Sequence, residues 1–343
     1  MIRRAPASAE RGMTVVELMI AVVILAIVVA AAFGVAFAIM NNYREHRRNT
    51  VVERSARGAM AVLAEAVRNA SPGVTNGKIY DLVGCDLAEH AISVTSPSDA
   101  PDSIDLIYAK GIPMDNDATQ MRQVVTSLRA AYSDTSPSMV VEDGSLLKVD
   151  DQILVTDFTT GALVRIQSIV QAGPDWNVTL AGGTPQAMCA APPAPFNYPA
   201  RATVIRAQRA RFFVDTALSI LKMDPTGGAP DDARAVAEGV EDLQIAIGVN
   251  RVGGSGLDEI AAAGDDDDWV YNHPDDASLP DLNATPWRAI RLTVIARSTE
   301  DTSLTATSLR PGAEDRDDAT TPDVFRRRVL STIVELRNLE GSP

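Results

Sequence analysis

The longest apolar stretch of the chain runs from Leu18 to Met40 and contains 23 residues without a charged or polar side chain. A helix rises about 1.5 Å per residue, so this stretch spans roughly 34 Å, enough to cross a hydrocarbon core of about 30 Å. Glu17 lies immediately before it. A charge carried to the bilayer centre costs about 2.5–3.5 kcal/mol, so such a carboxylate usually has a partner. The pattern predicts a membrane-spanning helix over residues 13–40 with a functional carboxylate at its start.

A second apolar pattern follows at helical spacing, and the charged residues fall off its stripe. The stripe consists of Val52, Ala56, Met60, Leu63, Val67 and Ala70. Steps of three and four residues place these side chains on one helix face. Pro72 ends the pattern because proline cannot continue the helical hydrogen-bond ladder. We therefore expect one helix from about Thr14 to Ala70, whose outer half, residues 41–70, packs on a soluble head.

The remaining residues, 71–343, change to the period-two alternation that is typical of strands. Predicted strands lie at 104–108, 152–156, 163–166, 211–214, 218–223, 243–249, 290–296 and 329–336. Polar segments, or segments rich in proline and glycine, predict surface loops at about 111–145, 184–200 and 250–287. The predicted fold class is α+β, with a long N-terminal helix packed on a mainly antiparallel β head.

Small residues recur every four positions within the membrane half of the helix. They are Ala26, Ala30, Gly34 and Ala38. One interpretation is a packing face, because small side chains let helix backbones approach closely in lipid. The other is that alanine is simply abundant in this chain. Both interpretations stay open at this point.

The residues around Glu17 resemble the class III signal of type IV prepilins and pseudopilins. The matching run is Arg11-Gly12-Met13-Thr14-Val15-Val16-Glu17-Leu18, preceded by a short basic leader that begins at Met1. An ordinary secretory signal has a shorter apolar core and a small-residue cleavage site after it. The resemblance implies that a prepilin peptidase removes residues 1–12 by cutting after Gly12 and methylates the amine of Met13. Met13 stands where phenylalanine is usual, and Glu17 would pair with the amine of a neighbouring subunit.

Several head segments resemble PilW-type minor pilins. They are Val149–Leu154, Val236–Ile245, Trp287–Leu292 and Arg326–Asn338, in that order. The resemblance implies a low-abundance subunit that starts pilus assembly and remains near the tip. Its implied partners are other minor pilins, the major pilin, a PilY-type adhesin, the prepilin peptidase and the inner-membrane assembly platform. The chain would cross the inner membrane once, with a periplasmic head, before it reaches the cell surface in a pilus that serves motility, adhesion or DNA uptake.

Two other functions stay open. A J-type minor pseudopilin of a type II secretion system shares the N-terminal signal, although such heads tend to be shorter. A membrane-anchored periplasmic enzyme or binding protein would keep its leader. The sequence offers no Ser-His-Asp or paired-carboxylate arrangement and no phosphate loop, so we expect neither an enzyme nor a cofactor.

Charge and histidine content narrow the partners further. The net charge is −14, and the first 50 residues contain six arginines and three glutamates, so the rest of the chain carries about −17. An acidic outer domain argues against binding of nucleic acid through a basic surface. The three histidines lie far apart in the sequence and predict no zinc site.

Two further features are candidates for structural roles. Cys85 and Cys189 are the only cysteines. In an oxidising compartment a disulfide between them would close about 104 residues and contribute about 4–5 kcal/mol, the alternative being two unpaired thiols. The acidic run Asp265, Asp266, Asp267 and Asp268 could bind calcium. Its spacing does not match an EF-hand loop, so a solvated acidic loop is favoured.

Overall fold

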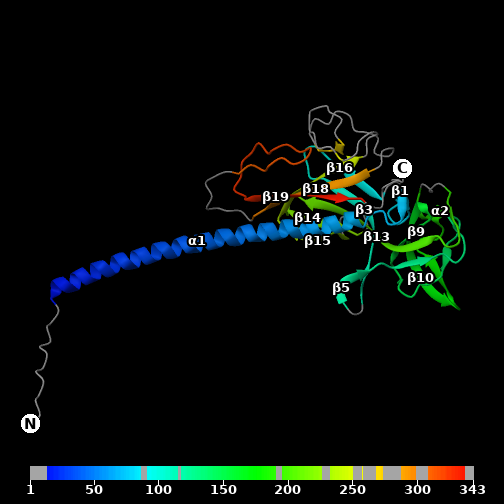
Figure 1. Cartoon of the computed structure of the whole chain (residues 1–343), viewed down its shortest axis with the longest axis horizontal. Helices are drawn as coiled ribbons and strands as arrows, with labels where there is room; N and C mark the ends of the chain where they lie inside the picture. The colour runs from blue at the N-terminus through cyan, green and yellow to red at the C-terminus, as the bar shows by residue number, and fades with distance from the viewer. Residues whose placement is uncertain are drawn as a thin grey trace, which may run out of the picture. The chain divides into compact units, whose positions relative to one another are not determined.

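The computed structural model describes residues 14–85, 91–114, 117–190, 195–225, 232–249, 257, 268–272, 287–298 and 308–336. The chain divides into two compact units, residues 1–51 and residues 52–343. We call the first unit the anchor and the second the head. One helix, α1 (Val15–Arg68), belongs to both units (Figure 1).

The anchor part of α1 has the character of a membrane span. Its most apolar 18-residue window has a mean hydropathy of 3.1. Its large apolar side chains are exposed throughout, from Val15 to Met40. Side chains that face outward along a whole helix are stable only against lipid or other helices. The helix thus agrees with the predicted span within two residues at its start.

The head part of α1 buries the predicted stripe. All six stripe residues, Val52, Ala56, Met60, Leu63, Val67 and Ala70, are at most 6% exposed. Beyond the helix the backbone turns sharply, because Ser71 and Gly73 both have positive φ angles, of 52° and 72°. The Ser71 amide then donates to the carbonyl oxygen of Ile107 at 2.9 Å. The amphipathic prediction is confirmed, and this half of the helix is fixed by tertiary packing.

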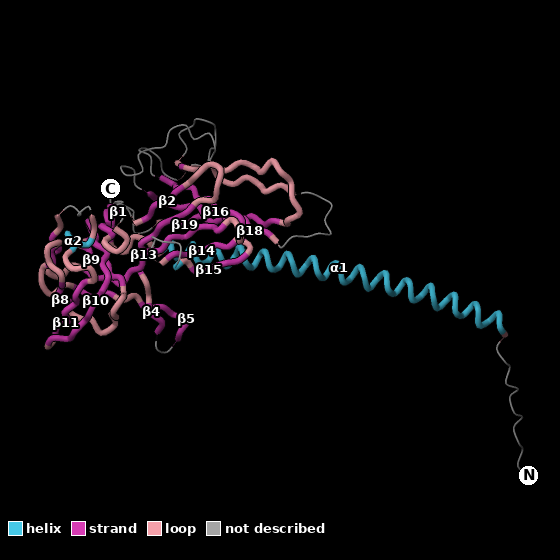
Figure 2. The backbone as a smooth tube through the Cα atoms, turned by 180° about the vertical axis from the view of Figure 1, so that it is seen from behind, coloured by secondary structure: helices cyan, strands magenta, loops and turns pink. Residues whose placement is uncertain are grey.

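The larger sheet of the head has eleven strands (Figures 1 and 2). Its main path runs in the order β15 (Arg234–Glu238), β14 (Ile220–Asp224), β13 (Thr203–Asp215), β9 (Gln152–Thr156), β10 (Phe158–Ala172), β11 (Asp175–Leu180) and β8 (Ser138–Val141). Four strands attach beside this path: β1 (Val74–Asp81), β2 (Ile92–Thr95), β3 (Ser103–Ala109) and β6 (Val125–Ser127). The pairing of β1 with β10 is parallel, and the other pairings in this sheet are antiparallel.

The second sheet has four antiparallel strands. They follow the order β17 (Trp269–Val270), β16 (Val240–Val249), β18 (Trp287–Arg297) and β19 (Arg327–Glu335). Two small pairs complete the head: β4 (Ile112–Met114) with β5 (Asp117–Arg122), and β7 (Tyr132–Ser133) with β12 (Asn197–Tyr198). A short helix, α2 (Pro185–Met188), precedes Cys189. The predicted fold class, one long apolar helix followed by a mainly antiparallel head, is confirmed.

The hydrophobic core has two main parts. In the first, Leu63 and Val67 of α1 meet Phe212 of the large sheet and Leu292 and Val334 of the four-stranded sheet. The second joins buried residues of the large sheet to the β7–β12 pair and includes an aromatic group of Tyr80, Tyr132, Phe196 and Tyr198. Residues of both sheets therefore pack in one core with this helix.

The predicted loops are partly wrong. Residues 111–145 contain five short strands, β4 to β8, and residues 184–200 contain α2 and β12. Met139 and Val141 are buried because β8 pairs with β11, which follows it by more than thirty residues. Apart from β5, these strands have only two to four residues each, and the sequence analysis found no alternation in them. Of the predicted loop at 250–287, residues 250–256, 258–267 and 273–286 lie outside the described residues, and Trp269 and Val270 form β17.

Candidate assembly site

Glu17 lies in the first turn of α1 and bonds back to the residue that precedes the helix. The Thr14 backbone N–H donates to Glu17 Oε2 at 2.9 Å, and the Thr14 hydroxyl donates to the same oxygen at 3.0 Å. The Glu17 backbone N–H in turn donates to Thr14 Oγ1 at 3.3 Å. This reciprocal arrangement is a capping box, in which a threonine and a glutamate three residues later satisfy the free N–H groups of a helix start.

The capping box gives Glu17 a local role that the sequence prediction missed. The signal was present in the spacing Thr14-x-x-Glu17, which is the usual form of this motif. The carboxylate also lies at the positive end of the helix dipole, which favours a negative charge. Both bonds go to Oε2, and the Glu17 residue is exposed. The predicted cleavage residues Gly12 and Met13, with the leader 1–12, lie outside the described residues.

The small residues of the anchor form an exposed row. Ala26, Ala30, Gly34 and Ala38 all have exposed side chains or backbone, and a Cβ atom added at Gly34 would meet nothing within 4 Å. In the single chain this row is open. Its role as a packing face for neighbouring helices is a proposal that the geometry permits.

The acidic block at the start of β16 is built around a glycine turn. Gly239 joins β15 to β16 with a φ of 74°, and the Arg297 amide donates to its carbonyl oxygen at 2.7 Å. A Cβ atom at this position would lie 3.1 Å from the carbonyl oxygen of Arg297, closer than most side chains tolerate. The turn therefore requires glycine, and it places the next two acidic residues beside the C-terminal part of the chain.

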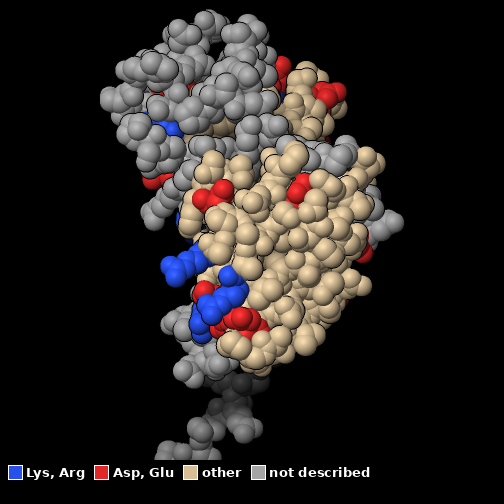
Figure 3. Space-filling model, turned by 90° about the vertical axis from the view of Figure 1, so that its right-hand side faces the viewer, with Lys and Arg blue, Asp and Glu red and all other residues tan. Residues whose placement is uncertain are grey.

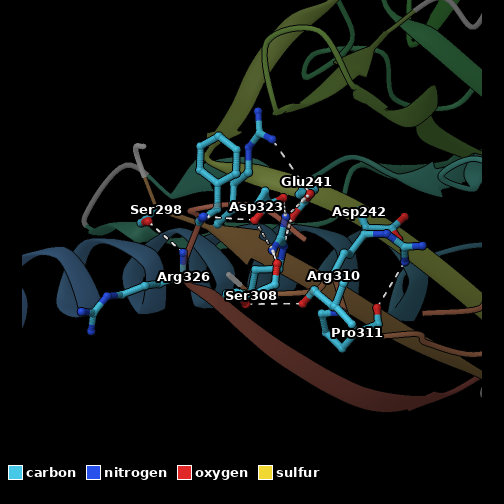
Figure 4. Close-up of polar contacts among 12 residues, drawn as sticks. Glu241, Asp242, Ser298, Ser308, Arg310, Pro311, Asp323 and Arg326 are labelled. Carbon is cyan, nitrogen blue, oxygen red and sulfur yellow. Dashed lines mark hydrogen bonds and ion pairs between the residues drawn. The ribbon is translucent and has the colours of Figure 1, made fainter. Parts of the chain in front are cut away.

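Glu241 binds Arg327, the first residue of β19 (Figure 4). The guanidinium donates from Nε to Glu241 Oε2 at 2.5 Å and from Nη2 to Oε1 at 2.9 Å, a bidentate pair. Arg327 also donates to Asp323 from Nη1 at 2.8 Å, and these bonds hold the pKa of Asp323 below its usual value. The Arg327 side chain is only 4% exposed, so the pair is largely shielded from solvent.

Asp242 points to two further arginines, Arg310 and Arg316. It is fully buried, and its Oδ2 lies 2.7 Å from Arg316 Nη1 and 3.2 Å from Arg310 Nη1. Gln244 donates from Nε2 to Asp242 Oδ1 at 2.9 Å. Together Glu241 and Asp242 tie residues 308–327 to the four-stranded sheet. The partners lie more than sixty residues away in the sequence, so the pattern alone could not predict them.

A second buried carboxylate, Asp102, lies beside this network. It accepts hydrogen bonds from the Ile245 amide at 2.7 Å and from the Ser96 hydroxyl at 2.8 Å. The same hydroxyl lies 3.0 Å from an oxygen of Asp315. Burial, the largest cause, raises the pKa of Asp102 to about 8, and the charges of Asp315 and Asp242 add to this effect. The sequence prediction missed this group because an isolated aspartate in a polar segment carries no signal.

The two cysteines are joined in the structure. Cys85 and Cys189 form a disulfide with a Cα–Cα distance of 5.4 Å across a sequence separation of 104. Near it, Arg209 binds Asp81 at 2.5 Å, and both side chains are at most 7% exposed. The disulfide and this ion pair connect the first strand region of the head to segments more than a hundred residues later.

The calcium interpretation is not supported by a formed site. Asp265, Asp266 and Asp267 lie outside the described residues. Asp268 is buried, and its carbonyl oxygen accepts a bond from the Val249 amide at 2.8 Å. Within the described ranges, no group of three or more His, Cys, Asp or Glu side chains could hold a metal ion.

One face of the head is drawn in Figure 3. Most of its described surface consists of uncharged residues, and its few basic side chains lie beside acidic ones. Phosphate backbones are bound through extended basic surfaces. The described part of this face offers no such surface.

An apolar anchor helix, a capped glutamate at its start and a β head packed on its outer half define the class of membrane-anchored pilins. Comparison with protein families agrees with this class. The family described as Type IV Pilus-assembly protein W matches residues 204–338, and the Prokaryotic N-terminal methylation motif matches residues 7–33. No characterised protein and no solved structure matches the chain. By these two matches the chain is similar to type IV pilins of the PilW family.

Proposed function

We propose that this minor pilin primes the assembly of a type IV pilus and stays in the minor-pilin complex near the tip. The observation that carries the proposal is the position of Glu17, capped by Thr14 at the start of an exposed apolar helix and within the matched methylation motif. A helix of this kind needs partners in lipid or in a filament. A carboxylate at the start of this helix would select the register in which the partner helices pack.

Pairing of Glu17 with a neighbour's terminal amine would control the register. A cut after Gly12 leaves Met13 as the first residue, and its methylated amine stays cationic. When a new helix slides into register, the amine of one subunit meets the carboxylate of another. A mismatched register leaves both charges unpaired in an apolar surrounding, which costs several kcal/mol. Because both Thr14 donors bind Oε2, Oε1 would accept the amine of a neighbour without breaking the cap.

The anchor accounts for the proposed location. The chain would cross the inner membrane once, with the head in the periplasm, until the assembly platform extracts it. The sequence has no nucleotide-binding motif, so the energy for extraction would come from the assembly motor. We propose other minor pilins, the major pilin and a PilY-type tip adhesin as neighbours in the filament, and the prepilin peptidase as the processing enzyme.

The family match favours the pilus over the alternatives. It covers β13 to β19, including Glu241 and Arg327, and its description names a pilus-assembly protein. Similarity to a pilin family suggests a structural subunit, so we propose no enzymatic activity. The J-type pseudopilin and the anchored periplasmic enzyme have no specific observation in their favour.

The test separates the charge of Glu17 from its capping role. Glu17→Gln removes the charge but keeps a side chain that can complete a capping box. Thr14→Val removes the capping hydroxyl but keeps the charge. The N-terminal mass of the protein is measured in sheared surface filaments and in membranes, and pili per cell are counted in strains that carry each variant or a deletion.

We expect the wild-type chain in the filament fraction to begin at methylated Met13. We expect few pili on cells of the deletion strain. Glu17→Gln should be processed but excluded from filaments, whereas Thr14→Val should still enter them. Filament entry of Glu17→Gln at the wild-type level would show that the charge is not needed. An intact leader, or normal piliation in the deletion strain, would exclude the priming function.

A further inference from the structure

In the part of the chain that the structure describes, strand β19 is the last strand of the four-stranded sheet. Among the described residues it pairs only with β18, through nine consecutive residue pairs without a bulge. With nine residues it is the longest strand that ends a sheet in the described part of the head. By comparison, the edge strand β15 has five residues, charged residues at both ends and a register shift against β14.

The register shows which backbone groups of β19 face outward. The Leu336 amide donates to the Arg288 carbonyl oxygen at 2.8 Å, and the Ser298 amide donates to the Arg326 carbonyl oxygen at 2.8 Å. The even-numbered residues therefore bond to β18, and in an antiparallel ladder the alternate residues point away from the partner. The N–H and C=O groups of residues 329, 331 and 333 are thus directed to the open edge.

The side chains in the middle of this edge carry no charge, whereas edge strands that are protected from pairing usually do. Residues 329–334, Val-Leu-Ser-Thr-Ile-Val, contain no charge, no proline and no glycine. Val329 and Ile333 are each 47% exposed on the solvent side of the sheet. Soluble proteins usually interrupt such an edge with a charged residue, a proline or a bulge, because it can bind another strand. β19 has none of these within that stretch.

We propose that β19 binds an extended strand of another subunit of the same pilus, which continues the four-stranded sheet across the subunit boundary. The partner strand would carry apolar residues at two alternate positions, to cover Val329 and Ile333. Exposed charges near the two ends of β19 constrain the residues at the ends of the partner strand. Arg328 lies near one end of β19 and Glu335 lies at the other. An acidic residue toward Arg328 and a basic residue toward Glu335 would complement them.

A second copy of this chain fits the edge less well. If two copies of β19 paired antiparallel about Ser331, Glu335 of one copy would lie opposite Arg327 of the other. That guanidinium is already bound by Glu241 and Asp323 and is 4% exposed. The exposed charges would then remain unmatched, which disfavours self-pairing.

The inference rests on the proposed function for the identity of the partner, and a photocrosslinking experiment tests both. The photoreactive residue p-benzoylphenylalanine replaces Ile333 in the full-length chain in piliated cells. A second strain carries it at Val170, an apolar strand residue that is 61% exposed at the far end of β10 and serves as the matched control. Crosslinked peptides from the membrane and filament fractions are identified by mass spectrometry.

We expect position 333 to crosslink to an extended segment of one other pilus subunit and position 170 to give no such product. Ile333→Lys should abolish filament entry, whereas Val170→Lys should not, with both variants melting like the wild type in detergent. Equal crosslinking from the two positions, or crosslinks only to a second copy, would overturn the inference. If the chain is present in filaments with methylated Met13 but residue 333 gives no crosslink, the edge proposal fails and the pilus function stands. A chain that never enters filaments overturns the pilus function itself.

Discussion

The buried carboxylate of Asp102 should make the head less stable as the pH rises. Its pKa in the folded head is raised from 3.8 to about 8, chiefly by burial. A carboxyl group with a raised pKa in the folded state binds its proton more tightly there than in the unfolded chain. Its contribution to stability is therefore fully present below pH 4 and is lost as the pH rises through about 8.

The magnitude follows from the size of the shift. The pKa rises by about four units, and each unit corresponds to 1.36 kcal/mol, so the stability contributed by this one group changes by roughly 5 kcal/mol between pH 4 and pH 9. Domains are stable by only about 5–15 kcal/mol in total. The geometry explains the preference for the neutral form. Ser96 has one hydroxyl proton and lies between Asp102 and Asp315, so it can donate to only one of the two carboxylates at a time.

The assay compares Asp102→Asn with the wild type. Asparagine keeps an oxygen for the Ile245 amide but cannot ionise, so the variant should lose this part of the pH dependence. The midpoint of urea unfolding is measured for the full-length protein in detergent at intervals from pH 4 to pH 9. Asp99→Asn, at an exposed position in the same segment, is the matched control and should follow the wild type.

As the pH rises, the urea midpoint of the wild type should therefore fall relative to the midpoint of Asp102→Asn. The same pH dependence in both proteins would refute the reasoning. So would a wild type that gains stability relative to the variant between pH 5 and pH 8.

Three further predictions concern the packing of the head, and each is measured by denaturant unfolding of the full-length protein in detergent. Leu63→Ala should lower the free energy of unfolding by about 2–5 kcal/mol, because this fully buried side chain fills the core between helix and sheets; a loss below 1 kcal/mol would contradict that placement. Reduction of the Cys85–Cys189 disulfide should cost about 4–5 kcal/mol through chain entropy, and no change on adding reductant would mean that the thiols are unpaired in solution. Arg327→Met should cost about 3–5 kcal/mol and expose residues 308–327 to protease, because it removes the bidentate partner of Glu241 and the ion-pair partner of Asp323, whereas Arg328→Met, at an exposed position, should do neither.

Long periodic patterns made the helix predictable from sequence. The apolar run that ends at Met40 and the stripe from Val52 to Ala70 each extend over several turns. A match to helical spacing over that length rarely arises by chance. A strand that matched is 243–249, in which large apolar residues stand at alternate positions. The strands that were missed are short, or carry polar residues that face solvent. β8 and β12 are strands only because β11 and β7 lie beside them.

The candidate site was predictable only where its partners are local. Glu17 stands out because a charge beside an apolar run is rare, and its capping partner Thr14 is three residues away. The partners of Glu241 could not be found in this way. Arg327 follows it by 86 residues, and only the order of the strands brings the two side chains together.

The core of the head joins the beginning of the chain to its end. Leu63 and Val67, from the first helix, share one buried cluster with Val334 and Leu336, which are among the last described residues. During synthesis the helix emerges first and the residues that cover it emerge last. The apolar stripe of α1 therefore cannot be fully enclosed until residues 334–336 have been made. A chain terminated before residue 334 would leave part of that stripe uncovered and could not present a closed head for assembly.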